Sequence, residues 1–299
     1  MNELRALIKR NAKLFFKDKG TFFTALITPA ILLVLYITFL GKVYRNAFAA
    51  GLPQGVVLEE RLLNGLVSGQ LVSSLLAVSC VTVAFCANMM MVSDKVTGAR
   101  RDLAMTPVSG VTLAMGYSIA TFFVTLLIGC VALAAGLCYI ACMGWYLSLW
   151  DVCCLLFDVV LLTLFGTLLS SLINACLSSQ GQISAVGTIV SSGYGFLCGA
   201  YMPISQFADW LRDVLGFLPG THATVLLRHH TTRGAFAEME AQHIPADVVD
   251  LARDSVDANL YFFEERVPHE VMLAVVGGSV VILALLYAWV QVHQLRKKA

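Results

Sequence analysis

The stretch VTLAMGYSIATFFVTLLIGCVALAAGLCYIACM, residues 111–143, decides the fold of this chain. It contains no Asp, Glu, Lys or Arg, and its apolar residues run on without the alternation that is typical of a barrel strand. A helix needs about 20 consecutive apolar residues to cross a bilayer. The stretch therefore predicts a membrane-spanning helix. Because it is longer than one crossing requires, we expect this helix to tilt or to project beyond the lipid.

Charge is scarce on both sides of this stretch as well. Between Leu103 and Ala208 the only charged residues are Asp151 and Asp158. Over all 299 residues, 58% are hydrophobic and 13% are charged, whereas soluble proteins carry about 25% charged residues. This composition excludes an ordinary soluble enzyme and a disordered protein. The net charge of +1 also excludes a general nucleic-acid-binding surface, so no nucleic acid is expected as a partner.

Length and hydropathy predict an all-α integral membrane protein with six transmembrane helices. The predicted spans are residues 21–40, 66–92, 111–143, 152–177, 183–201 and 271–292. Residues 1–20 and 293–299 flank this six-helix domain, which extends over residues 21–292. A secretory signal peptide is rejected, because the first apolar run is too long for one and the basic region before it is also too long.

Lys and Arg residues indicate the orientation of these spans. They cluster before the first span, between the second and third, and after the sixth, and these three segments share one side of a six-span protein. The long segment 202–269 falls on the opposite side and is acidic. Because cytoplasmic segments carry the excess of Lys and Arg, both termini are predicted to lie in the cytoplasm.

The N-terminal 20 residues have the pattern of an amphipathic interfacial helix. Apolar residues recur at helical spacing from Leu4 to Phe15, while Lys9, Lys13 and Lys17 step by four along another face. Such a helix lies in the membrane interface. The alternative interpretation is a simple basic tail that only directs insertion.

The connection between the second and third spans, residues 93–109, concentrates charge between two very apolar segments. Its charged residues are Asp94, Lys95, Arg100, Arg101 and Asp102. Thr106 and Pro107 then end any helix before the third span. A short charged helix that also carries Leu103 can dock in a cleft of a soluble partner, although a positively charged tether explains the same composition.

The fifth span is rich in small residues, among them Gly187, Gly193, Gly195 and Gly199. Small residues let helices approach closely in lipid, so this span is predicted to lie at a seam that moves or lines a substrate path. Plain tight packing is the alternative. The segment that follows has apolar runs too short to span, interrupted by Pro203 and Pro219, which predicts a re-entrant or interfacial helical hairpin. Residues 233–259 are expected to form one or two helices around Pro245.

Few residues suggest chemistry within the chain itself. Gly41-Lys42 lacks the rest of a phosphate-binding loop, so no nucleotide site and no catalytic residues are expected. Five of the six histidines lie in the external segment. A metal site from His229 and His230 is conceivable, but exposed polar residues are the simpler interpretation. Asp158 is the one acid inside a predicted span, where a proton-coupling role competes with a structural one.

Taken together, these residues resemble the ABC-2 family of ABC-transporter permeases. The shared features are the amphipathic N-terminal helix, the six spans, the charged connection that ends in Thr106-Pro107-Val108-Ser109, and a pattern after the fifth span. That pattern consists of Gly199, Met202, Pro203, Trp210, Leu211, Leu218, Pro219, Leu227 and Arg228. The chain departs from the family at Asp94, where Glu is common, and at Asp102.

The resemblance implies a permease subunit of a bacterial exporter, located in the cytoplasmic membrane, that pairs with a second copy or a similar permease. Two separate ABC ATPase subunits would bind ATP and Mg, and this chain would hold no cofactor or metal of its own. The connection from Asp94 to Pro107 would be the coupling surface, and Met202, Pro203, Trp210, Pro219 and Arg228 would belong to an outer gate. The expected substrate is an amphipathic drug, peptide antibiotic or lipid, which links the chain to multidrug or antibiotic resistance.

Two other functions remain open at this stage. One is a proton-coupled secondary transporter that depends on Asp158, although more intramembrane acids or broken helices would be expected in such a protein. The other is an integral membrane enzyme or a non-catalytic scaffold or sensor. That class predicts a cluster of His, Asp or Glu at one membrane face, and the sequence shows none.

Overall fold

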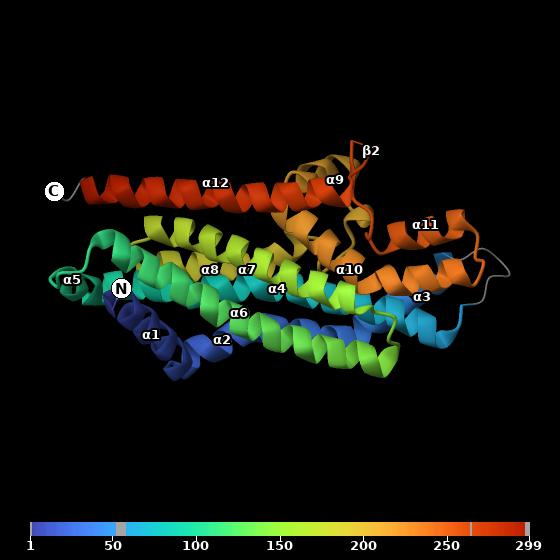
Figure 1. Ribbon diagram of the computed structural model, residues 1–299, viewed down its shortest axis with the longest axis horizontal. Helices are drawn as coiled ribbons and strands as arrows, with labels where there is room; N and C mark the ends of the chain where they lie inside the picture. The colour runs from blue at the N-terminus through green and yellow to red at the C-terminus, as the bar shows by residue number, and fades with distance from the viewer. Residues whose placement is uncertain (1, 52–57, 264, 297–299) are drawn as a thin grey trace.

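The computed structural model describes residues 2–51, 58–263 and 265–296, and these form an elongated bundle that is almost entirely helical (Figure 1). Residues 297–299 of the predicted tail lie outside the described residues. The helices and strands are α1 Asn2–Lys17, α2 Lys19–Leu35, the π-helix η1 Tyr36–Leu40, α3 Gly41–Gly51, α4 Glu60–Thr97, α5 Ala99–Ala104, α6 Gly110–Met143, α7 Leu149–Cys176, α8 Gln180–Leu197, the 3₁₀ helix η2 Ile204–Gln206, α9 Asp209–Gly216, α10 Pro219–Ala241, α11 Ala246–Ser255, β1 Tyr261–Phe262, β2 Glu265–Arg266 and α12 His269–Arg296.

Five helical stretches within the described residues are long and apolar enough to cross a membrane. They are Lys19–Asn46, Glu60–Thr97, Gly110–Met143, Leu149–Cys176 and His269–His293. They coincide with the predicted first, second, third, fourth and sixth spans. The predicted fifth span corresponds to α8, whose 18 residues include glycines, serines and glutamines. The multi-pass membrane fold is therefore confirmed, and the sixth crossing stays a prediction.

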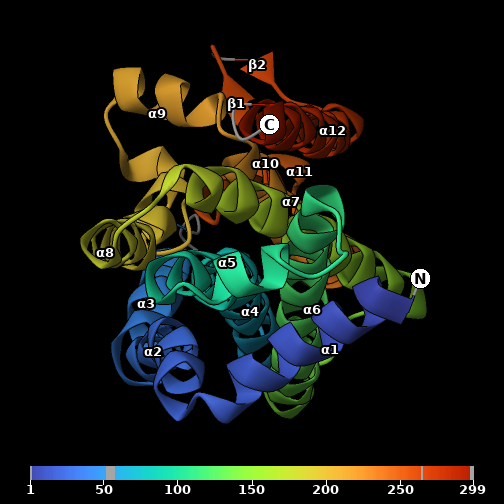
Figure 2. The same cartoon turned by 90° about the vertical axis from the view of Figure 1, so that its left-hand side faces the viewer.

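The central element of the bundle is α4, which packs against α2, α6, α7, α8 and α10. Figure 2, which looks along the bundle from the α5 end, shows α4 surrounded by these helices. Small residues make this position possible. A Cβ atom on Gly69 would lie 2.7 Å from the carbonyl oxygen of Thr231 in α10, and one on Gly166 of α7 would lie 3.0 Å from that of Cys80. These glycines allow α7 and α10 to contact the α4 backbone.

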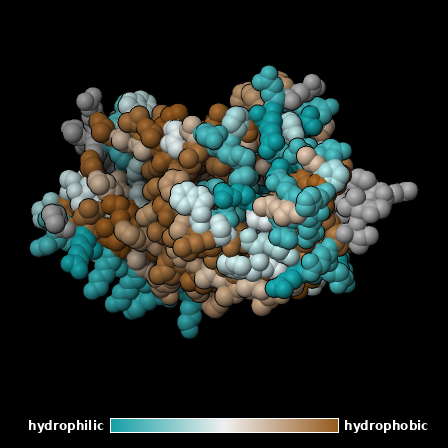
Figure 3. All heavy atoms as spheres, turned by 45° about the vertical axis from the view of Figure 1, so that its right-hand side comes forward, coloured by the Kyte–Doolittle hydropathy of each residue, from teal (hydrophilic) through white to brown (hydrophobic). Residues whose placement is uncertain are grey.

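The two ends of the bundle are polar and its middle is apolar. In Figure 1 the N-terminus, α5 and the C-terminal end of α12 lie at one end, while α3 and α11 lie at the other. Figure 3 shows hydrophobic residues gathered in a broad band between hydrophilic ends. The grouping of the termini with α5 agrees with the predicted topology. That this end faces the cytoplasm stays a prediction.

The segment between α8 and α12 forms a compact cap with several short elements. A two-residue antiparallel ladder pairs Tyr261 with Arg266 and Phe262 with Glu265. The long helix α10 begins at Pro219 and packs against α4, α7 and α12. The helix α11 follows Pro245, as the sequence predicted for this region. A re-entrant path for this segment stays a prediction.

Candidate functional site

The connection between α4 and α6 forms the short exposed helix α5. It begins after Gly98, whose φ of 87° is the left-handed conformation that glycine adopts most easily, and this residue ends α4. The turn at Thr106 and Pro107 follows, and the Ser109 hydroxyl then caps α6 by accepting a hydrogen bond from the Thr112 amide at 3.1 Å. The chain thus presents one helical turn and a half at the end of the bundle.

The structure separates the predicted coupling residues into two groups. One group faces outward and consists of Arg101, Asp102, Thr106 and Pro107. Met105 of the same segment is 80% exposed, whereas Arg100 and Leu103 are half-buried. The half-buried Leu103 packs on a core cluster that includes Leu7 of α1. A soluble partner can therefore touch this group directly, and force on it reaches α1 through Leu103.

Asp94 belongs to the second group, which lies inside the structure. Its carboxylate accepts two hydrogen bonds from Arg10 of α1, at 2.7 and 3.2 Å, and one from the Tyr117 hydroxyl of α6 at 2.6 Å. Its side chain is 11% exposed. Asp94 therefore ties α1 and α6 to the end of α4 and does not form part of the outer surface.

Lys95 makes the equivalent connection to α7. Its Nζ donates to the carbonyl oxygens of Asn174, Ala175 and Leu177 at 2.8–2.9 Å. The last carbonyls of a helix have no partners within that helix, and a cation there is favoured by the helix dipole. Through Asp94 and Lys95, the end of α4 next to α5 holds three other helices.

The N-terminal helix α1 has the two faces that its sequence predicted. Leu7 and Phe15 are buried, together with Asn11 between them. The close approach to α6 depends on Gly116, where a Cβ would lie 2.9 Å from the Leu7 side chain. The lysines of the other face, Lys9, Lys13 and Lys17, are exposed. This geometry suits a helix that lies on the membrane surface beside the coupling end.

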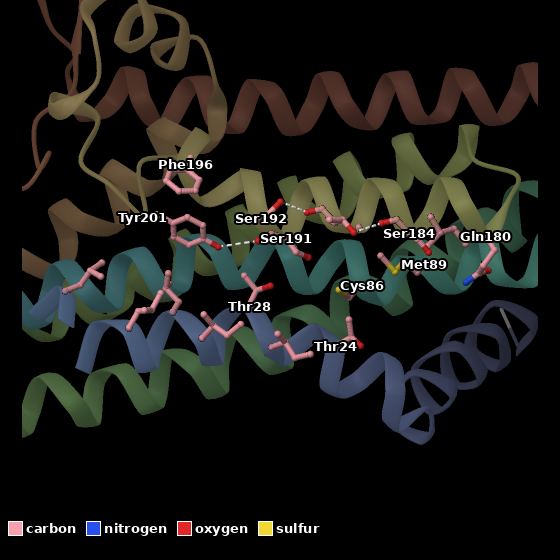
Figure 4. Close-up of a pocket in the computed structure, with 18 residues that line it drawn as sticks. Thr24, Thr28, Cys86, Met89, Gln180, Ser184, Ser191, Ser192, Phe196 and Tyr201 are labelled. Atoms are coloured by element: carbon pink, nitrogen blue, oxygen red, sulfur yellow. Dashed lines mark hydrogen bonds between the residues drawn. The ribbon is translucent and has the colours of Figure 1, made fainter. Parts of the chain in front are cut away.

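A large cleft separates α2 from α8, with α4 forming its floor (Figure 4). Its volume is about 840 Å³, within the usual range for ligand sites. Exposed apolar residues of α2, among them Ile27 and Ile31, lie along it, and Phe196 and Tyr201 close one end. No charged side chain lines the cleft among the described residues. It is open on the side away from α4, so the chain supplies only part of an enclosed site.

Hydroxyl groups make up most of the polarity of this cleft. Three of them already donate within their own helix: Thr24 to the carbonyl of Gly20, Thr188 to that of Ser184 and Ser192 to that of Thr188, at 2.7–2.9 Å. The hydroxyl oxygens can still accept hydrogen bonds. The cleft therefore suits a mainly apolar ligand with a few donor groups.

The four glycines predicted for the seam lie in different surroundings. Gly187 lines the cleft, and a Cβ there would lie 2.4 Å from the Met89 methyl of α4. Gly193 faces open space. Gly195 packs under the Tyr201 ring, and Gly199 has a φ of 72° in the turn after α8. Gly187 and Gly193 thus remain candidates for a seam, whereas the other two shape the outer turn.

Arg228 is the centre of a buried polar network inside the bundle. Its Nη2 donates to the Ser74 hydroxyl at 3.2 Å and to the Gly199 carbonyl at 2.9 Å, and its Nη1 lies 3.5 Å from Asp257. The Asp257 carboxylate accepts from the amides of Ile204 and Ser205. Burial raises the pKa of Asp257, and the nearby guanidinium opposes that effect. The network fixes the turn after α8 to α4 and α10.

The other predicted gate residues are not gathered around Arg228. Pro203 is buried next to the turn, and Met202 is half-buried. Trp210 in α9 is 69% exposed and points away from the core, as does Phe217 just beyond α9. Pro219 occupies the first turn of α10, where its missing N–H costs nothing. An outer closure would therefore consist of a rigid buried part around Arg228 and an exposed apolar part on α9.

A hydrogen bond and an ion pair that the sequence did not predict join α7 to α10. Nδ1 of His230 lies 2.6 Å from Oδ2 of Asp158, and Nε of Arg233 lies 3.1 Å from Oδ1 of Asp151. The signal was present in the spacing. Residues 151 and 158 share a helix face because they are seven apart, as do residues 230 and 233, which are three apart. Asp158 thus has a structural partner.

The interpretation of the external histidines as exposed polar residues is wrong for several of them. The ring of His229 stacks on that of His269 with centroids 3.7 Å apart, and His222 is buried with Nε2 2.8 Å from the Gly216 carbonyl oxygen. They are covered because α10 packs between α7 and α12. Burial lowers the pKa of His229 to about 3. Within the described part of the chain, no group of three His, Cys, Asp or Glu residues is placed to hold a metal ion.

The sequence model of a family described as ABC-2 type transporter matches residues 2–230, which include α1, the cleft, α5 and Arg228. No curated protein matches the chain.

Proposed function

The chain belongs to the ABC-2 type transporter family, and from this premise we propose that it is the permease half of an ATP-driven exporter for amphipathic molecules. Membership makes it a membrane-embedded permease that works with ABC ATPase subunits. The observation that carries the proposal for substrate is the uncharged cleft between α2 and α8. A drug, a peptide antibiotic or a lipid fits this lining better than a sugar or an ion, because a charged group would find no partner there.

The open side of the cleft supports a dimer. Ile27, Ile31 and Leu35 of α2, with Ile189 and Phe196 of α8, are between 44% and 68% exposed. A second copy that packed the same face against this one would turn two open clefts into one enclosed path, and such two-fold interfaces are the common form of homodimer. We expect the substrate to move along that seam.

The end of the bundle that carries α5 supports the proposal that separate subunits hydrolyse ATP. The exposed face of α5 offers Arg101, Asp102 and Met105 to a soluble subunit. Force on α5 passes directly into α4, and Asp94 and Lys95 distribute it to α1, α6 and α7. Two ATPase subunits would bind ATP and Mg and would push on α5. Their nucleotide-dependent closure would favour one of two arrangements of the helices, which is what alternating access requires.

We place the protein in the cytoplasmic membrane of a bacterium, with both termini and α5 in the cytoplasm. The excess of Lys and Arg near α1 and α5 supports this orientation. Substrate released beside the Arg228 network would then leave on the outer side, which makes the direction export. A role in drug or antibiotic resistance follows if the substrate is toxic to the cell.

One experiment tests the proposal as a whole. The chain is purified together with its partner ABC ATPase and is reconstituted into lipid vesicles. We expect ATP hydrolysis to be stimulated by amphipathic compounds, and an uncharged amphipathic dye to cross the membrane only when ATP is present. Dye movement driven by a proton gradient without ATP would overturn the proposal in favour of the secondary transporter.

A further inference from the structure

A second apolar groove lies on the face of α2 opposite the cleft. It has a volume of about 480 Å³ and is enclosed by α2, α4 and α6. Leu33, Ile37 and Val131 line it and are between 43% and 63% exposed, so the groove is open along the outside of the bundle. In a multi-pass membrane protein, the medium outside this part of the bundle is hydrocarbon.

The polar side chains that line this groove are Ser79, Tyr36 and Tyr139, and the first two already donate hydrogen bonds within the bundle. The Ser79 hydroxyl donates to the Leu75 carbonyl at 2.6 Å, and the Tyr36 hydroxyl donates to the Ala200 carbonyl at 2.8 Å. A ligand held here would gain apolar contact and little hydrogen bonding. This excludes sugars, peptides and ions, for which burial without partners is costly.

The length of the groove matches one hydrocarbon chain. Along α2 it runs from Leu26 to Ile37, which at 1.5 Å per residue is about 16 Å. One leaflet of a bilayer has a hydrocarbon depth of about 15 Å. An acyl chain that entered the groove at Ile37 would therefore end near Leu26.

A small basic pocket continues the groove at its Ile37 end. The two share Tyr36, Ile37 and Tyr139, and the pocket adds Lys42 and Arg45. Arg45 is paired with Glu60 at 2.6 Å. Lys42 is exposed and forms no ion pair with any residue that the structure describes. The pocket therefore has one uncompensated positive charge where the headgroup of a lipid in the groove would lie.

We propose that this groove is a binding site for an anionic phospholipid, with one acyl chain between α2, α4 and α6 and the phosphate at Lys42. An anionic phospholipid fits this site for two reasons. The apolar groove is about as long as one leaflet is deep, and it continues into a pocket where Lys42 forms no ion pair with any described residue. The site requires only that the chain lies in a membrane and does not depend on the proposed transport activity. Because the other face of α2 lines the cleft, a lipid bound here braces the wall that the proposed substrate touches.

The test compares two lipids and two matched pairs of variants. The full chain is purified in detergent, and its retention of dioleoylphosphatidylglycerol and dioleoylphosphatidylethanolamine is measured by native mass spectrometry. We expect one phosphatidylglycerol to be retained in preference to phosphatidylethanolamine. Lys42→Ala should weaken phosphatidylglycerol retention about fivefold, the usual contribution of one cation at a lipid surface, and leave phosphatidylethanolamine unchanged. Lys19→Ala, an equally exposed lysine at the start of α2, should behave as the unaltered chain.

The second pair of variants tests the groove itself. Ala135 lines the groove and is exposed, so Ala135→Phe fills the slot without entering the core. It should abolish retention of the bound lipid of either kind. Ala134 is exposed but lies outside the groove, and Ala134→Phe should retain the lipid. The proposal is overturned if both Phe variants retain lipid alike, or if Lys42→Ala has no effect on phosphatidylglycerol retention. It is also overturned if Ala135→Phe disrupts a dimer and leaves lipid retention unchanged. That last result would identify a second copy of the chain as the occupant of the groove.

Discussion

Nη1 of Arg10 lies 2.7 Å from Oδ2 of Asp94, and this ion pair fixes the N-terminal helix to the end of α4 next to α5. The Tyr117 hydroxyl donates to the same carboxylate at 2.6 Å, so α6 is part of the same cluster. Only Gly98 separates α4 from α5. Any movement of α5 under a partner subunit must therefore move or strain this cluster.

Replacing Asp94 with Ala should both destabilise the protein and weaken coupling. The change leaves Arg10 and Tyr117 without their acceptor, and because Arg10 is 30% exposed we expect a loss of about 2 kcal/mol, below the value for a fully buried pair. Thermal unfolding in detergent measures the loss. Substrate-stimulated ATP hydrolysis of the reconstituted complex should fall more than basal hydrolysis does.

A surface ion pair provides the control for Asp94. Arg45 and Glu60 are 2.6 Å apart, but the Glu60 side chain is 83% exposed. Exposed pairs contribute about 0–1 kcal/mol, so Glu60→Ala should leave the unfolding temperature nearly unchanged. If Glu60→Ala and Asp94→Ala have equal effects, the cluster at Asp94 does not have the structural role described above.

Reversing the charge of Arg100 and Arg101 should uncouple ATP hydrolysis from transport. These residues lie on α5, at the end that a soluble subunit can reach, and Glu at both positions would repel an acidic docking cleft. The double variant should still insert into the membrane. Transport of the dye and co-purification of the ATPase are the measurements.

The matched control for this double variant is Arg61→Glu with Arg266→Glu. Both residues are exposed. Arg61 lies at the start of α4 and Arg266 lies in β2, just before α12, and the other ends of these two helices approach α5. Since α4 has 38 residues, its two ends are about 57 Å apart, and Arg61 is therefore far from α5. The control pair should transport normally. Normal transport by the α5 double variant would show that α5 is not the docking surface.

Asp158→Asn should leave ATP-dependent export intact. The side chain is 5% exposed and pairs with His230, so it braces α7 against α10 and does not line the α2–α8 cleft. Asn keeps the size and one acceptor oxygen for His230. Asp158→Ala removes that acceptor and should lower stability by about 2 kcal/mol. Loss of export in Asp158→Asn with an unchanged unfolding temperature would instead favour a proton-coupled role.

The spans could be predicted from the sequence because hydropathy depends on local composition alone. The predicted first span ends at Leu40, where the π-helix ends, and the predicted third span begins one residue from the start of α6. The crossing predicted for α8 is harder to recognise from hydropathy, because α8 mixes glycine and serine with its apolar residues. The small residues that make α8 suitable for a seam also lower its hydropathy.

The pairing of charged side chains could be predicted less well. Asp94 and Lys95 were expected on the coupling surface because they belong to the cluster of charges between two very apolar spans, yet both are turned inward to α1 and α7. Such contacts join positions up to 84 residues apart, and no local pattern specifies them. Arg228 was predicted to belong to an outer gate, which stays a prediction, and its partner Asp257 lies in a polar turn that carries no distinguishing motif.

Acid should destabilise the protein through His229. Burial lowers the pKa of His229 to about 3, so the folded protein keeps this ring neutral while the unfolded chain binds a proton below about pH 6.5. The unfolded state then binds more protons between these values, and stability falls as the pH drops through that window. At pH 5 the loss from this residue should be about 2 kcal/mol.

The measurement is the unfolding temperature at pH 7 and pH 5. His229→Gln should show a smaller decrease between the two pH values than the unaltered chain does. His293→Gln serves as the control, because His293 is exposed on α12. A decrease of the same size in all three proteins would show that other groups cause the acid sensitivity.

Filling the cleft at Gly187 should block transport without stopping ATP hydrolysis. A Cβ at this position would already lie 2.4 Å from the flexible end of Met89, so Ala is accommodated by a small shift of that side chain, whereas Leu extends into the cleft. We therefore expect Gly187→Ala to transport the dye nearly normally and Gly187→Leu to transport it poorly, with basal ATPase activity retained. Gly277→Leu on α12, where nothing lies within 4 Å, controls for the added side chain. Combining Gly187→Leu with Met89→Ala returns space to the cleft floor and should restore part of the transport. If Gly187→Leu transports at the normal rate, the substrate does not pass between α2 and α8, and the seam must be sought on another face of the bundle.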